Sequence, residues 1–328
     1  MQAPSSKSPA LTPKTKTFVD ALAAENAPPI YTLSPEKARR VLIDAQSSLK
    51  VKPAADIQDK AVPAGPMGNV EIRIVRPQES KGKLPLIFYI HGGGWILGDK
   101  DTHDRLIREL AVKTGFAVLF PSFTPAPEAR FPTQLEQLYA LLLEVLDHPI
   151  EYGIDADNVA LVGDSVGGNM ATALCLMLKQ RGNAEVLKKI KIQCLFYPVT
   201  NASFDTGSYE AFADGPWLTR KSMQWFWDAY APEESRRSEI IASPLRASLD
   251  DLQGLPPACI ATAENDVLRD EGEAYAHRLM EAGVPTTAMR FLGTVHDFVM
   301  LDALAETTPT RGAIDFAVSM LRKALGDG

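Results

Sequence analysis

A serine between glycines marks the segment of this sequence with the clearest chemical meaning. The segment 163–168 reads Gly-Asp-Ser-Val-Gly-Gly, after the apolar run 158–162 and before a helical pattern over 169–180. A turn this tight has no room for side chains at its flanks, so glycines relieve the clash and Ser165 is exposed at the sheet edge. This arrangement is typical of a nucleophile elbow, and the alternative is an ordinary glycine-rich turn with a capping serine.

A second glycine-rich segment supplies the hydrogen-bond donors that a serine nucleophile needs. The segment 91–95, here called the glycine loop, reads His-Gly-Gly-Gly-Trp after an apolar, strand-like run. Uncovered backbone N–H groups can stabilise the oxyanion of a tetrahedral intermediate. We expect Gly93, Gly94 and Val166 to donate these bonds, and Gly92 to serve the turn itself.

The general base must be a histidine that follows the serine in the chain. Enzymes with this elbow have the order serine, acid, histidine. The chain has five histidines, namely His91, His103, His148, His277 and His296. His91 precedes Ser165 and is expected to shape the glycine loop, while His277 falls in an amphipathic helical pattern. His296 follows the strand-like run 286–292, which makes it the predicted base.

The acid is expected between the serine and the base, just beyond a strand. Asp266 is the first aspartate after the apolar run 258–263. Its carboxylate would orient the imidazole of His296 and stabilise the imidazolium. Asp270 and Glu271 are expected to cap and charge the first turn of the next helix. Asp270 and Glu264 remain the rival candidates for the acid.

These motifs, in this order, resemble the hormone-sensitive-lipase-like family of α/β-hydrolase esterases. The resemblance covers roughly residues 60–325, and its last elements are the Asp266–Gly272 segment Asp-Val-Leu-Arg-Asp-Glu-Gly and the His-Asp-Phe at 296–298. It implies an α/β-hydrolase fold, with a mostly parallel eight-stranded sheet, helices on both faces and a helical cap. It also implies that Ser165, Asp266 and His296 form a catalytic triad, with Asp164 as a structural or field-tuning neighbour.

Two positions depart from the family pattern. The family usually has alanine after the nucleophile, whereas this chain has Val166, which we expect to narrow the site or shift the acyl preference. The family often has Asp-Tyr-Arg before its Pro-Glu element, whereas residues 122–124 are Ser-Phe-Thr. Glu128 keeps its place as a structural residue, but the arginine that could pair with it there is absent.

Strand-like and helical patterns alternate along the chain, which predicts a mostly parallel sheet covered on both faces. The expected strands are 70–75, which is antiparallel, and 84–90, 116–120, 159–162, 190–196, 258–263 and 286–292. The expected helices are 14–24, 35–48, 101–114, 132–147, 166–181, 271–282 and 309–325. We divide the chain into N-terminal cap helices (1–50), a catalytic domain (51–200 and 244–328) and a cap insertion (201–243).

The cap insertion is rich in aromatic residues. It contains Trp217, Trp225, Phe226, Trp227 and Tyr230. Most of these are expected to fill the core of a small lid, while one or two face the nucleophile. Residues two apart on a helix diverge, so Trp225 and Trp227 cannot point the same way. We expect Trp95, Trp217 and Trp225 to line the substrate pocket.

Composition excludes several other classes of protein. The net charge of −7 argues against a nucleic-acid binder, which would carry an extended basic surface. The hydrophobic content of 45% is ordinary for a globular protein. No apolar run approaches the roughly 18 residues of a membrane span, and the N-terminal stretch lacks the apolar core of a secretory signal. Three cysteines, Cys175, Cys194 and Cys259, lie in apolar segments without metal-ligand spacing. Reduced thiols and a cytoplasmic location are therefore expected.

The expected function is that of a serine carboxylesterase acting on short-to-medium acyl esters through an acyl-enzyme, with no metal or organic cofactor. A small-molecule ester is the expected partner, and family resemblance implies a homodimer through the last strand region. An amidase, lactonase or deacetylase could use the same triad. A non-catalytic small-molecule receptor of the same fold is the alternative from another class.

Overall fold

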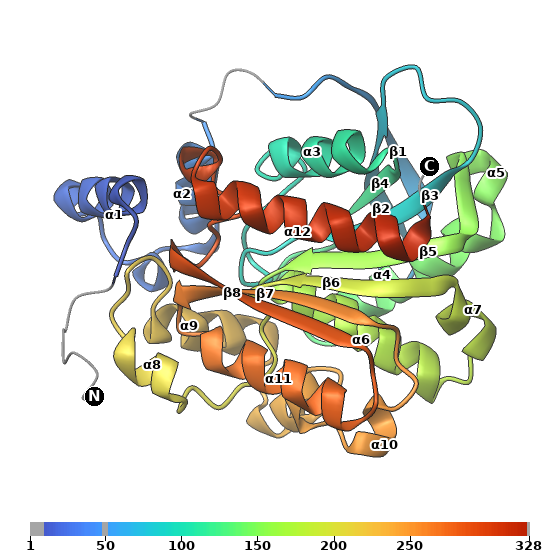
Figure 1. Cartoon of the computed structure of the whole chain (residues 1–328). Coiled ribbons are helices and arrows are strands. Elements are labelled where there is room, and N and C mark those ends of the chain that lie inside the picture. The colour runs from blue at the N-terminus through green and yellow to red at the C-terminus, as the bar shows by residue number, and fades with distance from the viewer. Residues whose placement is uncertain (1–9, 48–51, 327–328) are drawn as a thin grey trace.

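An eight-stranded sheet forms the centre of the molecule (Figure 1). The computed structural model describes residues 10–47 and 52–326. The strands are β1 Ala55–Pro63, β2 Asn69–Pro77, β3 Leu84–Ile90, β4 Ala117–Ser122, β5 Ile154–Asp164, β6 Ile190–Phe196, β7 Ala258–Asn265 and β8 Thr286–Val295. They lie in the order β1-β2-β4-β3-β5-β6-β7-β8. β2 pairs antiparallel with β1 and β4, and the remaining pairs are parallel.

Burial explains which strands the sequence pattern could predict. The central strands β3 and β6 have the predicted bounds, and nearly all their side chains are buried. Parallel strands covered on both faces read as continuous apolar runs. β1 was missed because this edge strand is mostly exposed and polar, so it has neither an apolar run nor a clean alternation.

Helices cover both faces of the sheet. In Figure 1, α3 and α12 lie over one face, and α4, α6 and α11 lie over the other. The α-helices are α1 Pro13–Glu25, α2 Pro35–Ala45, α3 Asp104–Thr114, α4 Thr133–Asp147, α5 Pro149–Tyr152, α6 Val166–Gln180, α7 Ala184–Lys189, α8 Gly207–Ala211, α9 Arg220–Tyr230, α10 Leu249–Leu252, α11 Arg269–Glu281 and α12 Thr308–Leu325. Four 3₁₀ turns complete the described elements, at Ile30–Thr32 (η1), Glu234–Ser238 (η2), Pro244–Arg246 (η3) and Asp302–Leu304 (η4). Within the described ranges, none of the helices combines the length and the apolar character needed to cross a bilayer.

Two groups of helices from distant parts of the chain lie at the same side of the molecule. Figure 1 shows α1 and α2 near α8 and α9, beyond the end of β8. The ring of Phe18 from α1 packs on Trp217 of the cap insertion, with centroids 5.5 Å apart. The N-terminal segment is also attached to the sheet, because the Thr12 amide donates to the Gly293 carbonyl at 3.0 Å. The two groups of helices therefore meet beyond the carboxyl end of β8.

The domain boundaries at 50, 200 and 244 stay a prediction. Residues 1–9 and 48–50 of the expected N-terminal unit lie outside the described residues, as do residues 51 and 327–328 of the expected catalytic domain.

Close packing of α6 on β3 fixes the position of the nucleophile elbow. A Cβ atom on Gly167, in the first turn of α6, would lie 1.9 Å from the Ile90 carbonyl oxygen at the end of β3. Real atoms cannot approach so closely, so either the helix or the strand would have to move. Glycine at this position therefore sets the distance between the helix and the strand.

We predict that Gly167→Ala lowers the free energy of unfolding by at least about 1–3 kcal/mol, because it overpacks a backbone contact that cannot relax. Gly312→Ala in α12 is the matched control, since its added Cβ would meet no atom closer than 3.6 Å. Alanine there should stabilise the helix by about 0.5–1 kcal/mol. Denaturant unfolding of both variants checks this, and equal stabilities would contradict it.

Candidate active site

Ser165 occupies the turn between β5 and α6 in a strained conformation. Its backbone angles are φ 54° and ψ −119°, a region that a residue with a side chain rarely adopts. Its amide donates to the Phe196 carbonyl at 2.8 Å, which fixes the turn to the end of β6. A Cβ on Gly163 would lie 2.3 Å from the Gly167 carbonyl carbon, so the flanking glycines are required by close approach. The sequence reasoning predicted this requirement.

The structure brings His296 and Asp266 together with Ser165. His296 follows β8 and Asp266 follows β7, so parallel strands deliver both side chains to one edge. His296 Nδ1 donates to Asp266 Oδ2 at 2.7 Å, and Nε2 lies 2.9 Å from Ser165 Oγ. In the neutral imidazole, a proton on Nδ1 that faces Asp266 leaves Nε2 free to accept the serine hydroxyl proton. All three side chains are buried.

Nearby carboxylates determine the protonation of His296. Burial alone would favour the neutral imidazole, but Asp266 and Asp297 outweigh it and raise the pKa of His296 to about 9. Asp297 Oδ1 lies 3.4 Å from Nε2, the same nitrogen that faces Ser165. The imidazolium is thus stabilised from both sides of the ring.

Gly93 and Gly94 line the cavity beside Ser165 and His296. Both have positive φ angles, 104° and 63°. Val166 is the first residue of α6, and the first N–H groups of a helix have no acceptor within it. Gly93 and Gly94 thus share a cavity with Ser165, and the role of these residues and Val166 as oxyanion donors stays a prediction. The side chain of Val166, however, is fully buried and outside the cavity lining, so it does not narrow the cavity as expected.

A buried network behind the nucleophile holds the glycine loop. Asp164 accepts hydrogen bonds from the Tyr89 hydroxyl at 2.7 Å and from the Gly92 amide at 3.0 Å. Its second oxygen lies 3.3 Å from His103 Nε2. Although burial opposes ionisation, His103 and these donors lower the pKa of Asp164. Asp164 therefore connects the elbow to the glycine loop as a charged acceptor.

His91 shapes the glycine loop. Its ring stacks on Phe123 with centroids 4.4 Å apart, and Nδ1 lies 2.7 Å from the Gly92 carbonyl oxygen. Burial lowers the pKa of His91 to about 4, so this ring is neutral at ordinary pH. Its described partners are Gly92, His103, Phe120 and Phe123, and none of them belongs to the proposed triad.

The rival acids hold other loops. Asp270 accepts from the Ser208 amide at 2.7 Å, and Glu264 accepts from the Gly293 amide at 2.7 Å. Glu271 accepts from the amides of Thr200 at 2.6 Å and Asn201 at 3.1 Å, and burial raises its pKa to about 8. Asp270 and Glu271 do lie in the first turn of α11, but their carboxylates bind the start of the cap insertion and do not cap the helix.

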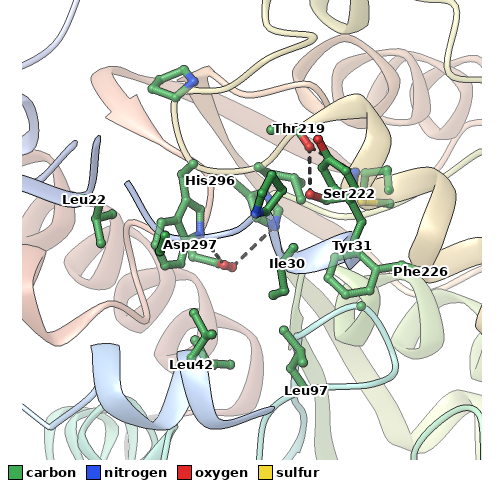
Figure 2. Close-up of a pocket in the computed structure, with 18 of the residues that line it drawn as sticks. Leu22, Ile30, Tyr31, Leu42, Leu97, Thr219, Ser222, Phe226, His296 and Asp297 are labelled. Atoms are coloured by element: carbon green, nitrogen blue, oxygen red, sulfur yellow. Dashed lines mark hydrogen bonds and ion pairs between the residues drawn. The ribbon is translucent and has the colours of Figure 1, made fainter. Parts of the chain in front are cut away.

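A cavity of about 520 Å³ opens onto Ser165 and His296. Its walls are mainly apolar. Figure 2 shows Leu22, Ile30 and Leu42 from the N-terminal segment around the same space as His296 and Asp297. Phe226 from α9 lies against the glycine loop, because a Cβ on Gly94 would fall 2.2 Å from its ring. Thus both groups of helices outside the sheet contribute walls to the cavity.

The three tryptophans expected in the pocket occupy different places. Trp217 lines the cavity and donates from Nε1 to Asp297 Oδ2 at 2.8 Å. Trp95 and Trp225 do not line it, which corrects the prediction. Trp95 is fully buried and stacks on Tyr230 with centroids 4.0 Å apart. Trp225 is half-buried beside Phe226, because adjacent residues on a helix face different directions and Phe226 takes the cavity side.

Several residues of the site were not predicted from the sequence. Asp297 could have been found as a second carboxylate directly after the predicted base. The N-terminal wall residues had only the Pro28-Pro29 break between two helical patterns as a signal. Glu128 does have an arginine partner, Arg39 of α2, at 2.7 Å. Its ionic support therefore comes from a segment far away in the sequence.

Comparison with known proteins agrees with this geometry. A family model described as an alpha/beta hydrolase fold matches residues 87–300. An esterase of Gibberella moniliformis is 37% identical over 279 residues, which cover 84% of this chain and 87% of that protein. Carboxylesterase NlhH of Mycobacterium tuberculosis is 32% identical over 278 residues, covering 83% and 86%.

Solved structures give the same result. The crystal structure of a thermostable esterase from Pseudomonas putida ECU1011 is 43% identical, with a TM-score of 0.94 over 98% of this chain and 99% of that chain. A fungal esterase from Rhizomucor miehei is 37% identical, with a TM-score of 0.89 over 97% of each chain. The chain belongs to the hormone-sensitive-lipase-like group of the α/β-hydrolase fold family and is a hydrolase of the carboxylesterase type.

Proposed function

We propose that this protein hydrolyses small carboxylic esters with Ser165 as nucleophile, His296 as general base and Asp266 as the orienting acid. The observation that carries the proposal is the continuous chain of contacts at the cavity wall. Asp266 Oδ2 lies 2.7 Å from His296 Nδ1, and His296 Nε2 lies 2.9 Å from Ser165 Oγ. Contacts of this length allow proton transfer without rearrangement of the side chains.

The reaction follows from this chain. His296 Nε2 takes the hydroxyl proton as Ser165 Oγ attacks the ester carbonyl carbon. The N–H groups of Gly93, Gly94 and Val166 hold the resulting oxyanion. His296 then gives the proton to the alcohol as it leaves, and an acyl-enzyme remains on Ser165. A water molecule, deprotonated by the same imidazole, repeats the attack and releases the acid.

The cavity supports a substrate of short-to-medium acyl length. Its volume of about 520 Å³ lies in the range of small-molecule sites, and its walls are mainly apolar. A relative from Pseudomonas putida that is 32% identical bears the name ethyl acetate hydrolase. Amides or lactones could use the same residues, but the names of the relatives favour esters.

Ser165→Ala should fold normally and lower ester turnover by about 10⁴–10⁶-fold, because the covalent step is lost. Initial rates on p-nitrophenyl esters from acetate to palmitate measure both this loss and the acyl preference. A fluorophosphonate probe should label the wild-type protein and the control Ser238→Ala, whose exposed serine lies in η2. Near-normal hydrolysis by folded Ser165→Ala would remove this residue from the mechanism.

Asp266→Asn should lower kcat by about 10³–10⁴-fold, because an amide no longer enforces the required tautomer of His296. Asp270→Asn is the matched comparison, since Asp270 bonds to the Ser208 amide and not to the imidazole. It should retain most of the activity. If Asp270→Asn proves the more damaging change, the acid has been assigned to the wrong residue.

The activity should depend on pH through His296. Only the neutral imidazole accepts the serine proton, so kcat/KM should rise with pH as His296 loses its extra proton. Although burial lowers the pKa of His296, Asp266 and Asp297 raise it to about 9, so the rise should continue until about pH 9. The negative charge of Asp164 also raises the pKa of His296. Asp297→Asn removes one carboxylate, so it should lower the pKa of His296 and move the rise in kcat/KM to lower pH.

Profiles of kcat/KM from pH 5 to pH 10 measure this displacement. Asp315→Asn provides a control, because this aspartate lies on α12 and its side chain is 63% exposed. It should leave the midpoint in place. A midpoint that stays fixed or rises in Asp297→Asn would contradict the electrostatic argument.

A further inference from the structure

Arg39 of α2 makes an unusually complete set of hydrogen bonds for a residue outside the sheet. Its guanidinium binds the Glu128 carboxylate through both terminal nitrogens, Nη1 to Oε1 at 2.9 Å and Nη2 to Oε2 at 2.7 Å. This fork-to-fork geometry is the strongest form of arginine–carboxylate pairing. Hydrogen bonding with Arg39 also lowers the pKa of Glu128, against the opposing effect of its burial.

The same guanidinium binds two backbone carbonyls. Arg39 Nε donates to the Ile96 carbonyl at 2.9 Å, and Nη2 also donates to the Ala126 carbonyl at 3.1 Å. The side chain of Arg39 is 25% exposed, so these bonds are partly shielded from water. One side chain thus joins α2, the residues just after the glycine loop and the segment that follows β4.

These carbonyls belong to the backbone that carries the proposed oxyanion donors. The amides of Ile96 and Leu97 donate to the Gly93 carbonyl at 3.2 and 2.8 Å, closing a turn over residues 93–97. The Ala126 amide donates to the Trp95 carbonyl at 2.8 Å. Arg39 therefore binds both of the hydrogen-bonded backbone segments, residues 93–97 and the segment at Ala126. The first of these contains Gly93 and Gly94.

α2 also forms part of the cavity wall. Val41 and Leu42 line the cavity together with Leu97 of the turn. Figure 2 shows Leu42 and Leu97 on the same side of the space in front of His296. The residue that binds the backbone beside the glycine loop and the side chains that line this part of the cavity thus belong to the same helix.

We propose that Arg39 is a positioning residue, which holds the Gly93 and Gly94 N–H groups in place for the oxyanion and couples this geometry to the seating of α2 on the cavity. The inference rests on the proposed function. Displacement of catalytic groups by about 1 Å can cost about 100-fold in rate. Loss of Arg39 leaves the donors present but less well held, so its effect should fall on the transition state more than on substrate binding.

The experiment compares Arg39→Ala and Arg39→Lys with Arg40→Ala. Arg40 is the matched control, because it lies on the same helix, is 72% exposed and pairs only across the helix surface with Asp44 in the contacts described. Arg39→Ala should lower kcat by about 10- to 100-fold with less than about threefold change in KM. Lysine keeps the charge but lacks the planar fork, so Arg39→Lys should restore only part of kcat. Arg40→Ala should behave as wild type.

A second measurement separates positioning from a general loss of stability. A boronic acid forms a tetrahedral adduct with the serine, so its affinity should fall in parallel with kcat in the Arg39 variants. Circular dichroism and thermal unfolding establish that each variant is folded, and Arg39→Lys provides a folded variant if alanine is not tolerated. Full kcat with unchanged boronic-acid affinity in folded Arg39→Lys and Arg39→Ala overturns the inference, as does a change confined to KM.

The two hypotheses fail in different ways. If Ser165→Ala remains active, the proposed function is wrong whatever Arg39 does. If Ser165→Ala is inactive and the Arg39 variants keep kcat, the mechanism stands and the positioning role alone is wrong.

Discussion

The site depends on one close approach of backbone to backbone. Ser165 can present its hydroxyl only from a turn with φ 54°, and that turn closes only because Gly163 lies against the first turn of α6. The Gly167 contact with the Ile90 carbonyl sets where the glycine loop begins, since β3 ends at that residue. The proposed nucleophile and the proposed oxyanion donors are therefore positioned by the same contact. A shift of α6 would move both groups relative to the imidazole.

Carboxylates gather around this turn, and each has a separate physical role. Asp266 orients one nitrogen of His296, and Asp297 faces the other. Asp164 binds the glycine loop from behind. Their common effect is to favour the imidazolium, which helps the step in which His296 carries the proton but opposes its starting neutral form. In the proposed mechanism this balance sets the pH at which the enzyme works, and Asp297 is well placed to adjust it because its carboxylate lies 3.4 Å from His296 Nε2.

The sequence was sufficient for the parts of the fold in which local pattern and burial agree. The apolar runs of β3 and β6 appear as predicted because both strands are buried on both faces. Ser165, Asp266 and His296, which lie together in the structure, could be proposed from the sequence because each follows a strand and the expected order is serine, acid, histidine. β1 was missed because its exposed side chains carry no periodic signal.

The pocket was harder to predict, because its walls depend on tertiary packing. Trp95 was expected to line the pocket because it is the last residue of the glycine loop, but its backbone has φ 59° and its side chain packs in the core against Tyr230. Trp225 and Phe226 are neighbours in sequence, and only packing of α9 decides which one faces the cavity. Arg39 and Glu128 form an ion pair although they are 89 residues apart in the sequence, and no local sequence pattern predicts such a pair.

This difference between catalytic groups and pocket walls has a structural reason. Strand ends are held by the hydrogen bonds of the sheet, which for the edge strand β8 come from β7 alone, so they offer the small tolerances that proton transfer requires. The walls include residues of α1, α2 and α9, which lie outside the sheet, and Phe18 of α1 packs on Trp217 of the cap insertion. Such elements can vary in sequence and move more readily than the strands they cover. The hydrogen bond from Arg39 to the Ile96 carbonyl is important for this reason. It attaches α2, which forms part of the cavity wall, to the backbone that follows β3 and the glycine loop.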